Sequence, residues 1–313
     1  MGKYITKRAL QSLLTILIII FVVFMLLRLM PTEGYFTRTD FENMTEAERT
    51  QYLIDNDVLG NPFVLFGKFI LKLFKGDLGI SYRIQPYVSV TQILSQKIPY
   101  SLYFGLASMV ISLILGLSLG AFMARFKDKF PDMLGTAYIV MVRAVPSLIY
   151  LFLIQIWLTK LFNIPLTFNE RNVATWILPV ISLSLSSIAW YGIWLRRFMV
   201  DEENKDYVKF ATSKGIKKKT LIRTHILRNA LVPLAQYIPV QILLTISGSL
   251  IIESLYSIPG MGGLLVDAIK EMDNNLVQIL VMIFSILGVV GVFLGDLLMA
   301  LIDPRIKFTS AKN

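Results

Sequence analysis

The sequence of 313 residues is 55% hydrophobic and 17% charged, and its mean hydropathy is +0.63. Soluble domains contain about 45–50% apolar residues, so this composition excludes an ordinary soluble protein and indicates a membrane protein. The chain has no cysteine, which excludes disulfide frameworks, cysteine-ligated zinc and thiol catalysis. What its net charge of +10 means depends on where along the chain the basic residues lie.

Apolar segments long enough to cross a hydrocarbon core of about 30 Å as helices recur along the chain. They are predicted at residues 9–29, 100–124, 133–158, 176–195, 233–252 and 276–302. Basic residues precede the first segment, as in a secretory signal peptide, but its apolar run is too long and no small-residue cleavage site follows. We therefore predict an all-α polytopic membrane protein with six transmembrane helices and an uncleaved first helix.

Lysine and arginine are concentrated on one side of this topology. Of the 31 basic residues, 19 lie before the first segment, between the second and third, between the fourth and fifth, or after the sixth. In the long segment 31–98, by contrast, eight acidic residues offset seven basic ones. The positive-inside rule then predicts that both termini are cytoplasmic. The charge thus reflects topology, and no compact basic domain with interleaved aromatic residues supports nucleic-acid binding.

The segment 31–98 is predicted to be external and to contain short helices. Thr45 and Glu48 have the spacing of a capping box, and Asn61 can cap a second helix in which Pro62 occupies the first turn. Three lysines recur at helical spacing on the otherwise apolar surface of this second helix: Lys68, Lys72 and Lys75. Two interpretations stay open, namely that this helix lies in the membrane interface or that it packs on the outer ends of the spans.

The loop between the fourth and fifth segments, residues 196–232, is too long for a simple connection. Residues 206–214 favour a short helix, Gly215 breaks it, and a basic second helix from about Lys217 leads through Asn229 and Pro233 into the membrane. A helix–glycine–helix elbow at the membrane face has a shape that can seat in a groove of a partner protein.

This elbow resembles the cytoplasmic coupling loop of binding-protein-dependent ABC importer permeases. The residues that carry the resemblance are Tyr207-Val208-Lys209-Phe210-Ala211-Thr212-Ser213-Lys214-Gly215 and Arg228-Asn229-Ala230-Leu231-Val232-Pro233. Only Ala211 keeps the family's Glu-Ala-Ala-like triplet before the glycine, as is usual in the peptide-importer branch.

Three further stretches resemble the oligopeptide, dipeptide and nickel permeases of this family. They are Gly76-Asp77-Leu78-Gly79-Ile80-Ser81-Tyr82, Pro259-Gly260-Met261-Gly262-Gly263-Leu264-Leu265-Val266-Asp267-Ala268-Ile269, and Asp303-Pro304-Arg305-Ile306-Lys307. The resemblance covers nearly the whole chain, although residues 32–56 match poorly. The glycines after Pro259 indicate a tight turn that guides the chain back into the membrane, because no strand precedes them and no P-loop lysine follows.

The resemblance implies a type I ABC importer permease fold. Its parts would be a first transmembrane helix at 1–30, the external segment 31–98, a core domain at 99–303 that includes the coupling loop 196–232, and a cytoplasmic tail at 304–313. The implied function is import of oligopeptides or dipeptides delivered by an external solute-binding (lipo)protein. The implied partners are a second homologous permease, two ABC ATPase subunits or domains that use ATP and Mg, and the lipid of a bacterial or archaeal plasma (inner) membrane.

The resemblance also implies roles for particular residues. Those expected to couple transport to the ATPase are Asp206, Tyr207, Ala211, Lys214, Gly215, Asn229 and Pro233. Those that belong to the external family motifs are Gly76, Asp77, Gly79, Ser81, Pro259, Gly260 and Gly262.

Arg143 lies within the third predicted span, where a charged side chain costs at least ~2.5–3.5 kcal/mol unless it faces protein or water. One interpretation is that it lines the substrate path with Ser184 and Ser187 and contacts a peptide carboxylate. The other interpretation is that Arg143 pairs with a buried acid or with carbonyls, and that the serines of the fourth span serve packing.

The sequence argues against chemistry on this chain itself. It contains no GxxxxGK[ST] motif, so ATP must be hydrolysed by separate subunits, and we expect no bound cofactor, metal or catalytic residue. Its single histidine, His225, has neither cysteine nor paired carboxylates with which to form a metal site. Alternatives to peptide cargo are nickel chelates, other metallophores, glycosides or antimicrobial peptides. A membrane-embedded enzyme and a scaffold protein are the remaining alternatives, disfavoured by the lack of acidic or histidine clusters and by the elbow respectively.

Overall fold

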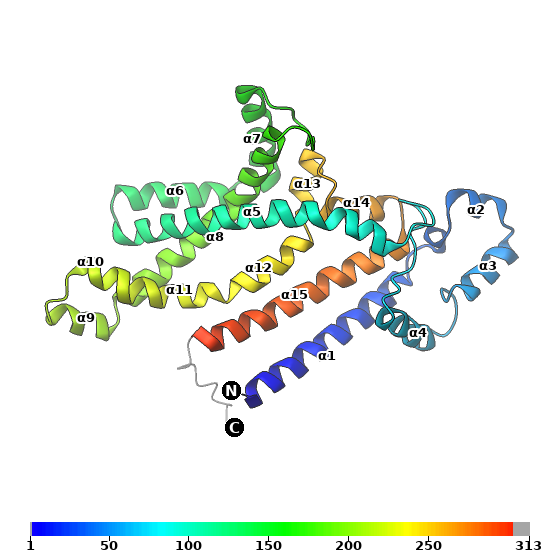
Figure 1. Ribbon diagram of the computed structural model, residues 1–313, viewed down its shortest axis with the longest axis horizontal. Helices are drawn as coiled ribbons and strands as arrows, with labels where there is room; N and C mark the ends of the chain where they lie inside the picture. Colours follow the sequence, from blue (N-terminus) through cyan, green and yellow to red (C-terminus); the bar gives the residue numbers. More distant parts are fainter. Residues whose placement is uncertain (1, 303–313) are drawn as a thin grey trace. The chain divides into compact units, whose positions relative to one another are not determined.

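The computed structural model describes residues 2–302 (Figure 1), so the expected tail at 304–313 and the matched stretch Asp303–Lys307 lie outside the described residues. Within 2–302 the regular structure is helical apart from one isolated bridge between Ile80 and Ser89. The helices up to the middle of the chain are α1 (Gly2–Leu27), the 3-10 helix η1 (Thr32–Tyr35), α2 (Arg38–Asn43), α3 (Glu46–Asp55), α4 (Pro62–Phe74), α5 (Val90–Arg125), α6 (Phe130–Ala144) and α7 (Ser147–Phe162). They are followed by α8 (Ala174–Glu203), α9 (Asp206–Ser213), α10 (Lys218–Leu221), the π-helix η2 (Ile222–Ile226), α11 (Leu227–Ala235), α12 (Tyr237–Ile246), α13 (Leu250–Tyr256), α14 (Met261–Lys270) and α15 (Asn274–Ile302).

Four helices of the described chain, α1, α5, α8 and α15, are long and apolar enough to cross a membrane, and three bent helix pairs raise the number to as many as seven. The six predicted spans fall within this range. The prediction for 233–252 differs from the structure in detail, because α12 ends at Ile246 and Gly248 adopts a φ of +71°. The chain then forms a separate bent pair, α13 and α14, with an angle of 84°.

Prolines account for two of the bends. α6 and α7 meet at 107° where Pro146 follows Val145, and the residue before a proline is disfavoured in helical conformation. α11 and α12 are bent by 42° between Ala235 and Tyr237, one turn before Pro239. A proline ring clashes with the carbonyl four residues earlier, which here belongs to Ala235.

The chain divides into two compact units. The first comprises the chain up to Leu102 together with Ile246–Ser254 and Pro259–Val290. Its core is an apolar cluster from α1, the start of α5, α14 and the start of α15, which includes Ile20, Ile93, Met261, Leu276 and Leu280. Burial of such side chains in a common cluster fixes the two ends of the external segment.

The short helices of the external segment form as their sequence predicts. The Thr45 hydroxyl accepts the Glu48 amide, and the Glu48 carboxylate accepts the Thr45 amide, which completes the capping box at the start of α3. Asn61 caps α4 by accepting the Phe63 amide, and Pro62 occupies the first turn. A small apolar cluster of Tyr35, Phe36, Leu53 and Tyr82 packs against residues of α2 and α3, among them Phe41 and Tyr52.

The second unit comprises Tyr103–Thr245, Leu255–Ile258 and the chain from Gly291 onwards. Its core joins α8 to the segment that follows it, with Leu195 and Met199 of α8 packed against Val208, Ile226 and Ala230. The helical elbow predicted for residues 196–232 is therefore attached to the end of α8 by a buried apolar cluster.

Candidate functional site

The elbow has a well-defined turn at Gly215. Gly215 has a φ of +79°, and its amide donates to the Thr212 carbonyl over 2.9 Å while the Ile216 amide donates to the Ala211 carbonyl over 3.2 Å. These two bonds form a Schellman motif, which ends α9 and favours glycine at the left-handed position. A Cβ added at Gly215 would meet no atom within 4 Å, so the backbone angle and not crowding calls for glycine.

A hydrogen-bonded hub joins α9 to its neighbours. The Tyr207 hydroxyl donates to the Glu202 carboxylate over 2.8 Å, and the Asn229 amide donates to the same Glu202 oxygen over 3.0 Å. The Asn229 amide also lies 3.1 Å from the Tyr207 hydroxyl, and Lys205 forms an ion pair with the second Glu202 oxygen. Partial burial raises the pKa of the Tyr207 hydroxyl, and the bond to Glu202 adds to this effect. The hub thus connects the end of α8, the start of α9 and the first turn of α11.

One side of α9 is buried and the other side is open. Val208 is buried in the apolar cluster beneath the elbow, whereas the Tyr207 and Phe210 side chains are 37% and 61% exposed. The Lys214 ammonium lies 4.5 Å from the centre of the Phe210 ring, which is a cation–π contact. Exposed aromatic side chains of this kind are enriched at protein interfaces.

The second arm of the elbow is one helical run, Lys218–Ala235, interrupted by the π-turn η2. The sequence predicts this helix and the positions of Asn229 and Pro233 on it, but it carries no clear signal for the π-turn, which sequence reasoning missed. Such turns are rare and recur at functional sites. Pro233 lies inside α11, so its missing amide leaves one helical bond unmade shortly before the bend at Gln236.

The end of α8 is also fixed to the start of α6. The Arg196 guanidinium donates two hydrogen bonds, each of 2.6 Å, to the Asp132 carboxylate, whose residue is only 3% exposed. A bidentate pair of this kind fixes both distance and orientation. Glu202 of the hub and Arg196 of this ion pair lie on one continuous helix, α8, which therefore links the hub mechanically to α6.

The matched stretch that begins with Pro259 starts in the turn after α13, as the sequence predicts, and continues as α14 from Met261. The Glu253 carboxylate, with its residue 3% exposed, accepts the amides of Gly262 and Gly263 over 2.7 and 3.0 Å, and the Ser101 hydroxyl over 2.8 Å. A Cβ added at Gly260 would lie 2.3 Å from the Glu253 carboxyl carbon. The glycines are needed here because the backbone surrounds a buried carboxylate.

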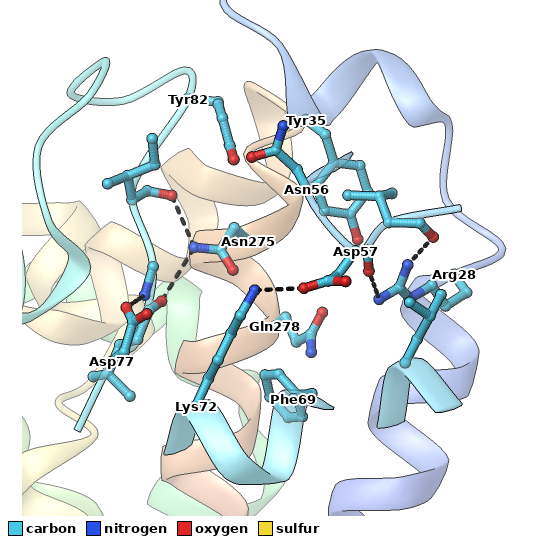
Figure 2. Close-up of a pocket in the computed structure, with 15 residues that line it drawn as sticks. Arg28, Tyr35, Asn56, Asp57, Phe69, Lys72, Asp77, Tyr82, Asn275 and Gln278 are labelled. Carbon is cyan, nitrogen blue, oxygen red and sulfur yellow. Dashed lines mark hydrogen bonds and ion pairs between the residues drawn. The ribbon is translucent and has the colours of Figure 1, made fainter. Parts of the chain in front are cut away.

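The stretch Gly76–Tyr82, predicted to be external, is hydrogen-bonded to the turn between α14 and α15. The buried Asp273 carboxylate accepts the Ser81 hydroxyl and the amides of Tyr82, Arg83 and Ile84, three bonds of 3.0–3.2 Å for the amides. The Asn275 amide donates to the carbonyls of Leu78 and Ile80 over 3.2 and 2.8 Å (Figure 2). Gly79 has a φ of +74°, and an added Cβ would lie 2.7 Å from the Asn275 amide nitrogen. The Asp77 carboxylate accepts a hydrogen bond from the Gly79 amide, so the motif forms a turn that is fixed by side-chain hydrogen bonds.

Arg143 and the two serines that are expected to line the substrate path, Ser184 and Ser187, differ in their surroundings. Arg143 is exposed in the last turn of α6, and among the described residues it has no hydrogen bond or ion pair. Ser184 is buried and donates to the Ile181 carbonyl over 2.7 Å, while Ser187 is half-buried. The neighbouring Ser182 and Ser186 are bonded to Tyr256 and Tyr150, which favours a packing role for most of this serine stripe.

Comparison with known proteins identifies the family. The family described as "Binding-protein-dependent transport system inner membrane component" matches residues 116–308, which include the elbow and the turn at Glu253. The chain belongs to this family. The described part of the chain also contains no group of three or more His, Asp or Glu that could hold a metal ion.

The relatives found are peptide permeases by name. The oligopeptide transport system permease protein AmiC of Streptococcus pneumoniae is 35% identical over 57% of this chain, and the match spans 36% of the AmiC length. The dipeptide transport system permease protein DppB of Lactococcus lactis subsp. cremoris is 28% identical over 98% of this chain and 100% of its own length. The oligopeptide transport system permease protein OppB of Haemophilus influenzae is likewise 28% identical, over 98% of this chain and 100% of its own.

A solved structure supports the fold. An amino acid ABC transporter crystallised with histidines has a chain that matches with a TM-score of 0.51 and 17% sequence identity, covering 69% of this chain and 95% of that chain. This likeness, together with the helical architecture, confirms the predicted all-α permease fold.

Proposed function

We propose that the chain is the transmembrane permease subunit of an ATP-driven importer that moves oligopeptides or dipeptides into the cytoplasm. In this proposal the peptides are delivered by an external solute-binding (lipo)protein. The chain pairs with a second homologous permease and with two ABC ATPase subunits or domains, which use ATP and Mg. It resides in a bacterial or archaeal plasma membrane with both termini cytoplasmic. The expected division into a first helix (1–30), external segment (31–98), core (99–303) and tail (304–313) belongs to the same proposal.

The observation that carries the proposal is the open side of α9. Tyr207 and Phe210 are exposed on a short helix whose opposite side is held by a buried apolar cluster. Aromatic side chains are enriched at protein interfaces relative to the rest of the surface. An ATPase groove that covers Tyr207 and Phe210 would therefore bury apolar surface without any rearrangement of the elbow.

The contacts around α9 give a route by which ATPase movement reaches the membrane helices. A displacement of α9 acts on Glu202 through Tyr207 and on α11 through Asn229. Along α8, the same displacement reaches α6 through the Arg196–Asp132 pair. α6 ends at the sharp bend before Pro146, next to Arg143. We infer that the opening and closing of the importer involve this bend.

Arg143 is the residue that we propose for the substrate path. Its side chain has no partner in the described chain, and a charged group in a span requires either water or a polar partner. A peptide carboxylate in the path supplies such a partner, and the half-buried Ser187 belongs to the same proposed path. Ser184 contributes less, because its hydroxyl already bonds within its own helix.

A first test is to purify the chain from its native membrane in mild detergent, identify co-purifying proteins by mass spectrometry, and analyse small molecules released on denaturation. We expect a second permease, ATPases, and a solute-binding protein that carries peptides. Recovery of the chain alone, under conditions that preserve other ABC complexes, would contradict the proposal. Recovery of the same complex with a metal chelate or glycoside would retain the importer and replace its cargo.

A sharper test places a negative charge on the open side of α9. We expect Phe210→Glu to abolish recovery of the ATPases and peptide uptake, while membrane insertion and recovery of the second permease are unchanged. The matched control is Thr212→Glu, which adds the same charge on the same helix about 160° around its axis from Phe210. If Phe210→Glu retains the ATPases as well as Thr212→Glu does, α9 is not the docking element.

A further inference from the structure

Helix α4 presents three distinct sides, which can be assigned by its helical period of about 100° per residue. The first side packs on the core of the first unit through Phe66, Phe69, Ile70 and Leu73. The second side carries the lysines Lys68, Lys72 and Lys75. The third side is apolar and open, with Phe63, Val64, Leu71 and Phe74 lying within an arc of about 100°.

The open apolar side is large for a segment outside the long spans. The exposed fractions of Phe63, Leu71 and Phe74 are 71%, 62% and 86%. Gly67 lies among them, and a Cβ added there would meet no atom within 4 Å. A row of exposed apolar side chains along three turns of one helix is not stable in contact with water and indicates a surface that is covered in the assembled membrane.

The lysine row separates this apolar side from a polar cavity. Lys68 and Lys72 donate to the Asp57 carboxylate over 2.7 and 2.9 Å. Beyond them lies a cavity of about 300 Å³ whose mixed lining includes the polar residues Arg28, Asp57, Asp77 and Asn275 (Figure 2). Figure 2 shows Lys72 rising from α4 towards Asp57, with Phe69 of the same helix below. The lysine side of α4 therefore suits water, and the adjoining apolar side suits hydrocarbon.

Contacts with α1 indicate the depth at which α4 lies. Phe21 of α1 packs against Phe63 and Phe66 with ring centres 6.2 and 5.1 Å apart, and Phe24 lies 5.2 Å from Phe69. The membrane-spanning part of α1 extends to Leu27, so Phe21 and Phe24 lie about 5–9 Å before its end at 1.5 Å per residue. Helix α4 is thus held at the boundary between the hydrocarbon core and the headgroups.

We propose that α4 is an interfacial anchor that binds the phospholipid surface on this side of the membrane. Phe63, Val64, Leu71 and Phe74 lie among the acyl chains, and the lysine row lies at the level of the lipid phosphates. The second side of α4 carries three lysines, of which Lys68 and Lys72 bind the single carboxylate of Asp57, so its net charge is positive and favours phosphate over a neutral protein groove. Phe63 of the open apolar side also contacts Phe21 of α1, a helix of whose spanning window only 11% is buried.

The absence of cysteine from the chain allows a direct test. Phe74→Cys is labelled with an environment-sensitive NBD fluorophore in the full importer complex, and the complex is reconstituted in nanodiscs that contain doxyl lipids. Two matched controls are labelled in the same way: Ala47→Cys, exposed on α3, and Leu17→Cys, exposed in the middle of α1. Gel fluorescence verifies that the label is on this chain.

We expect the label at position 74 to emit at shorter wavelength than the label at 47 and to be quenched several-fold more by a doxyl group near the headgroup than by one deep in the acyl chain. The label at 17 is expected to show the reverse order of quenching, and the label at 47 neither effect. Equal iodide quenching at 74 and 47 would overturn the proposal, because α4 would then face water. A short-wavelength emission at 74 without lipid quenching would also overturn it, because a protein partner would then cover this side. Neither result bears on the proposed role of α9.

Discussion

The chain contains two glycine turns that require glycine for opposite reasons. At the turn between α13 and α14, an added Cβ at Gly260 or Gly262 would lie 2.3 Å from Glu253 or 2.7 Å from Leu250. At the turn after α9, Gly215 has open space around it and is required by its φ of +79°. The turn between α13 and α14 is enclosed by neighbouring atoms, whereas the turn after α9 has a fixed backbone conformation with free space beside it.

This difference separates a structural turn from one available to a partner. Glu253 is buried and accepts hydrogen bonds from three backbone amides, those of Ser249, Gly262 and Gly263, so any displacement of this turn leaves a buried carboxyl group with unmade hydrogen bonds. The turn after α9 is fixed by its Schellman bonds and by the side chains of the hub, which is partly exposed. A rigid element with an open surface can transmit the movement of a docked ATPase, and the enclosed turn holds α13 against α14 meanwhile.

The largest loss of stability is expected when a methyl group is added in the turn between α13 and α14. Gly260→Ala places a Cβ against the Glu253 carboxyl carbon and forces the carboxylate away from its amide donors. We expect the stability of the purified chain to fall by about 3 kcal/mol or more, because a buried carboxylate then loses several hydrogen bonds. Thermal unfolding in detergent, together with the yield in the membrane, measures the loss.

The control for Gly260→Ala is Gly288→Ala in α15, where an added Cβ meets no atom within 4 Å. Alanine at a helical position is favoured over glycine by roughly 0.5–1 kcal/mol, so this variant is expected to match or exceed the parent in stability. Equal stability of the two variants would remove the distinction between the enclosed turn and the open one.

A smaller change in stability, with a larger change in transport, is expected at Gly215. A β-branched residue is strongly disfavoured in the left-handed region, so Gly215→Val is expected to lose about 2 kcal/mol and to distort the end of α9. Peptide uptake per ATP hydrolysed is expected to fall in reconstituted complexes, while insertion in the membrane is unchanged. Gly288→Val, at an equally open position within the helix α15, serves as the control. Unchanged coupling in Gly215→Val would count against the elbow.

Local sequence signals predict much of the fold, and the features that they miss depend on contacts between residues far apart in the sequence. The capping box at Thr45, the cap at Asn61 and the helix break at Gly215 depend on residues within a few positions of each other, and the structure contains all three. The apolar segments predict spans, yet the break at Gly248 divides the segment 233–252 because Glu253 draws the following turn around itself. Hydropathy has no means to detect that arrangement.

The site was predictable to a similar degree. The elbow residues are contiguous in sequence, so Tyr207, Gly215 and Asn229 could be found there. Their partner Glu202 lies in the charged end of α8, and nothing in the sequence distinguishes it from Glu203 beside it. Asp273 could have been suspected, because it stands with two asparagines at the start of an apolar helix, a typical capping position. Its bonds to residues 81–84 depend on the tertiary fold.

The smallest change in stability is expected at Asp57, whose carboxylate pairs with lysines at the surface. Asp57, in the turn between α3 and α4, pairs with Lys68 and Lys72, whose side chains are 54% and 48% exposed. The hydrogen bonds from these lysines hold the pKa of the Asp57 carboxyl below its usual value. Because the pKa is lower in the folded state, the stabilisation is present above the unfolded pKa of about 3.9 and is lost as the pH falls through the folded value.

We expect this loss to be at most about 1 kcal/mol, since the lysines are solvated and exposed ion pairs contribute little. Hydrogen exchange of the amides in α4, corrected for the intrinsic effect of pH, is expected to accelerate slightly from pH 6 to pH 3.5. Asp57→Asn is expected to give the faster exchange already at pH 6 and to remove the dependence on pH, since asparagine tolerates the φ of +60° at this position. Asp55→Asn, on the exposed end of α3, controls for the loss of one charge. Protection that increases as the pH falls would contradict the assigned direction of the Asp57 shift, and a loss as large as that of Gly260→Ala would mean that surface and buried carboxylates anchor this chain equally.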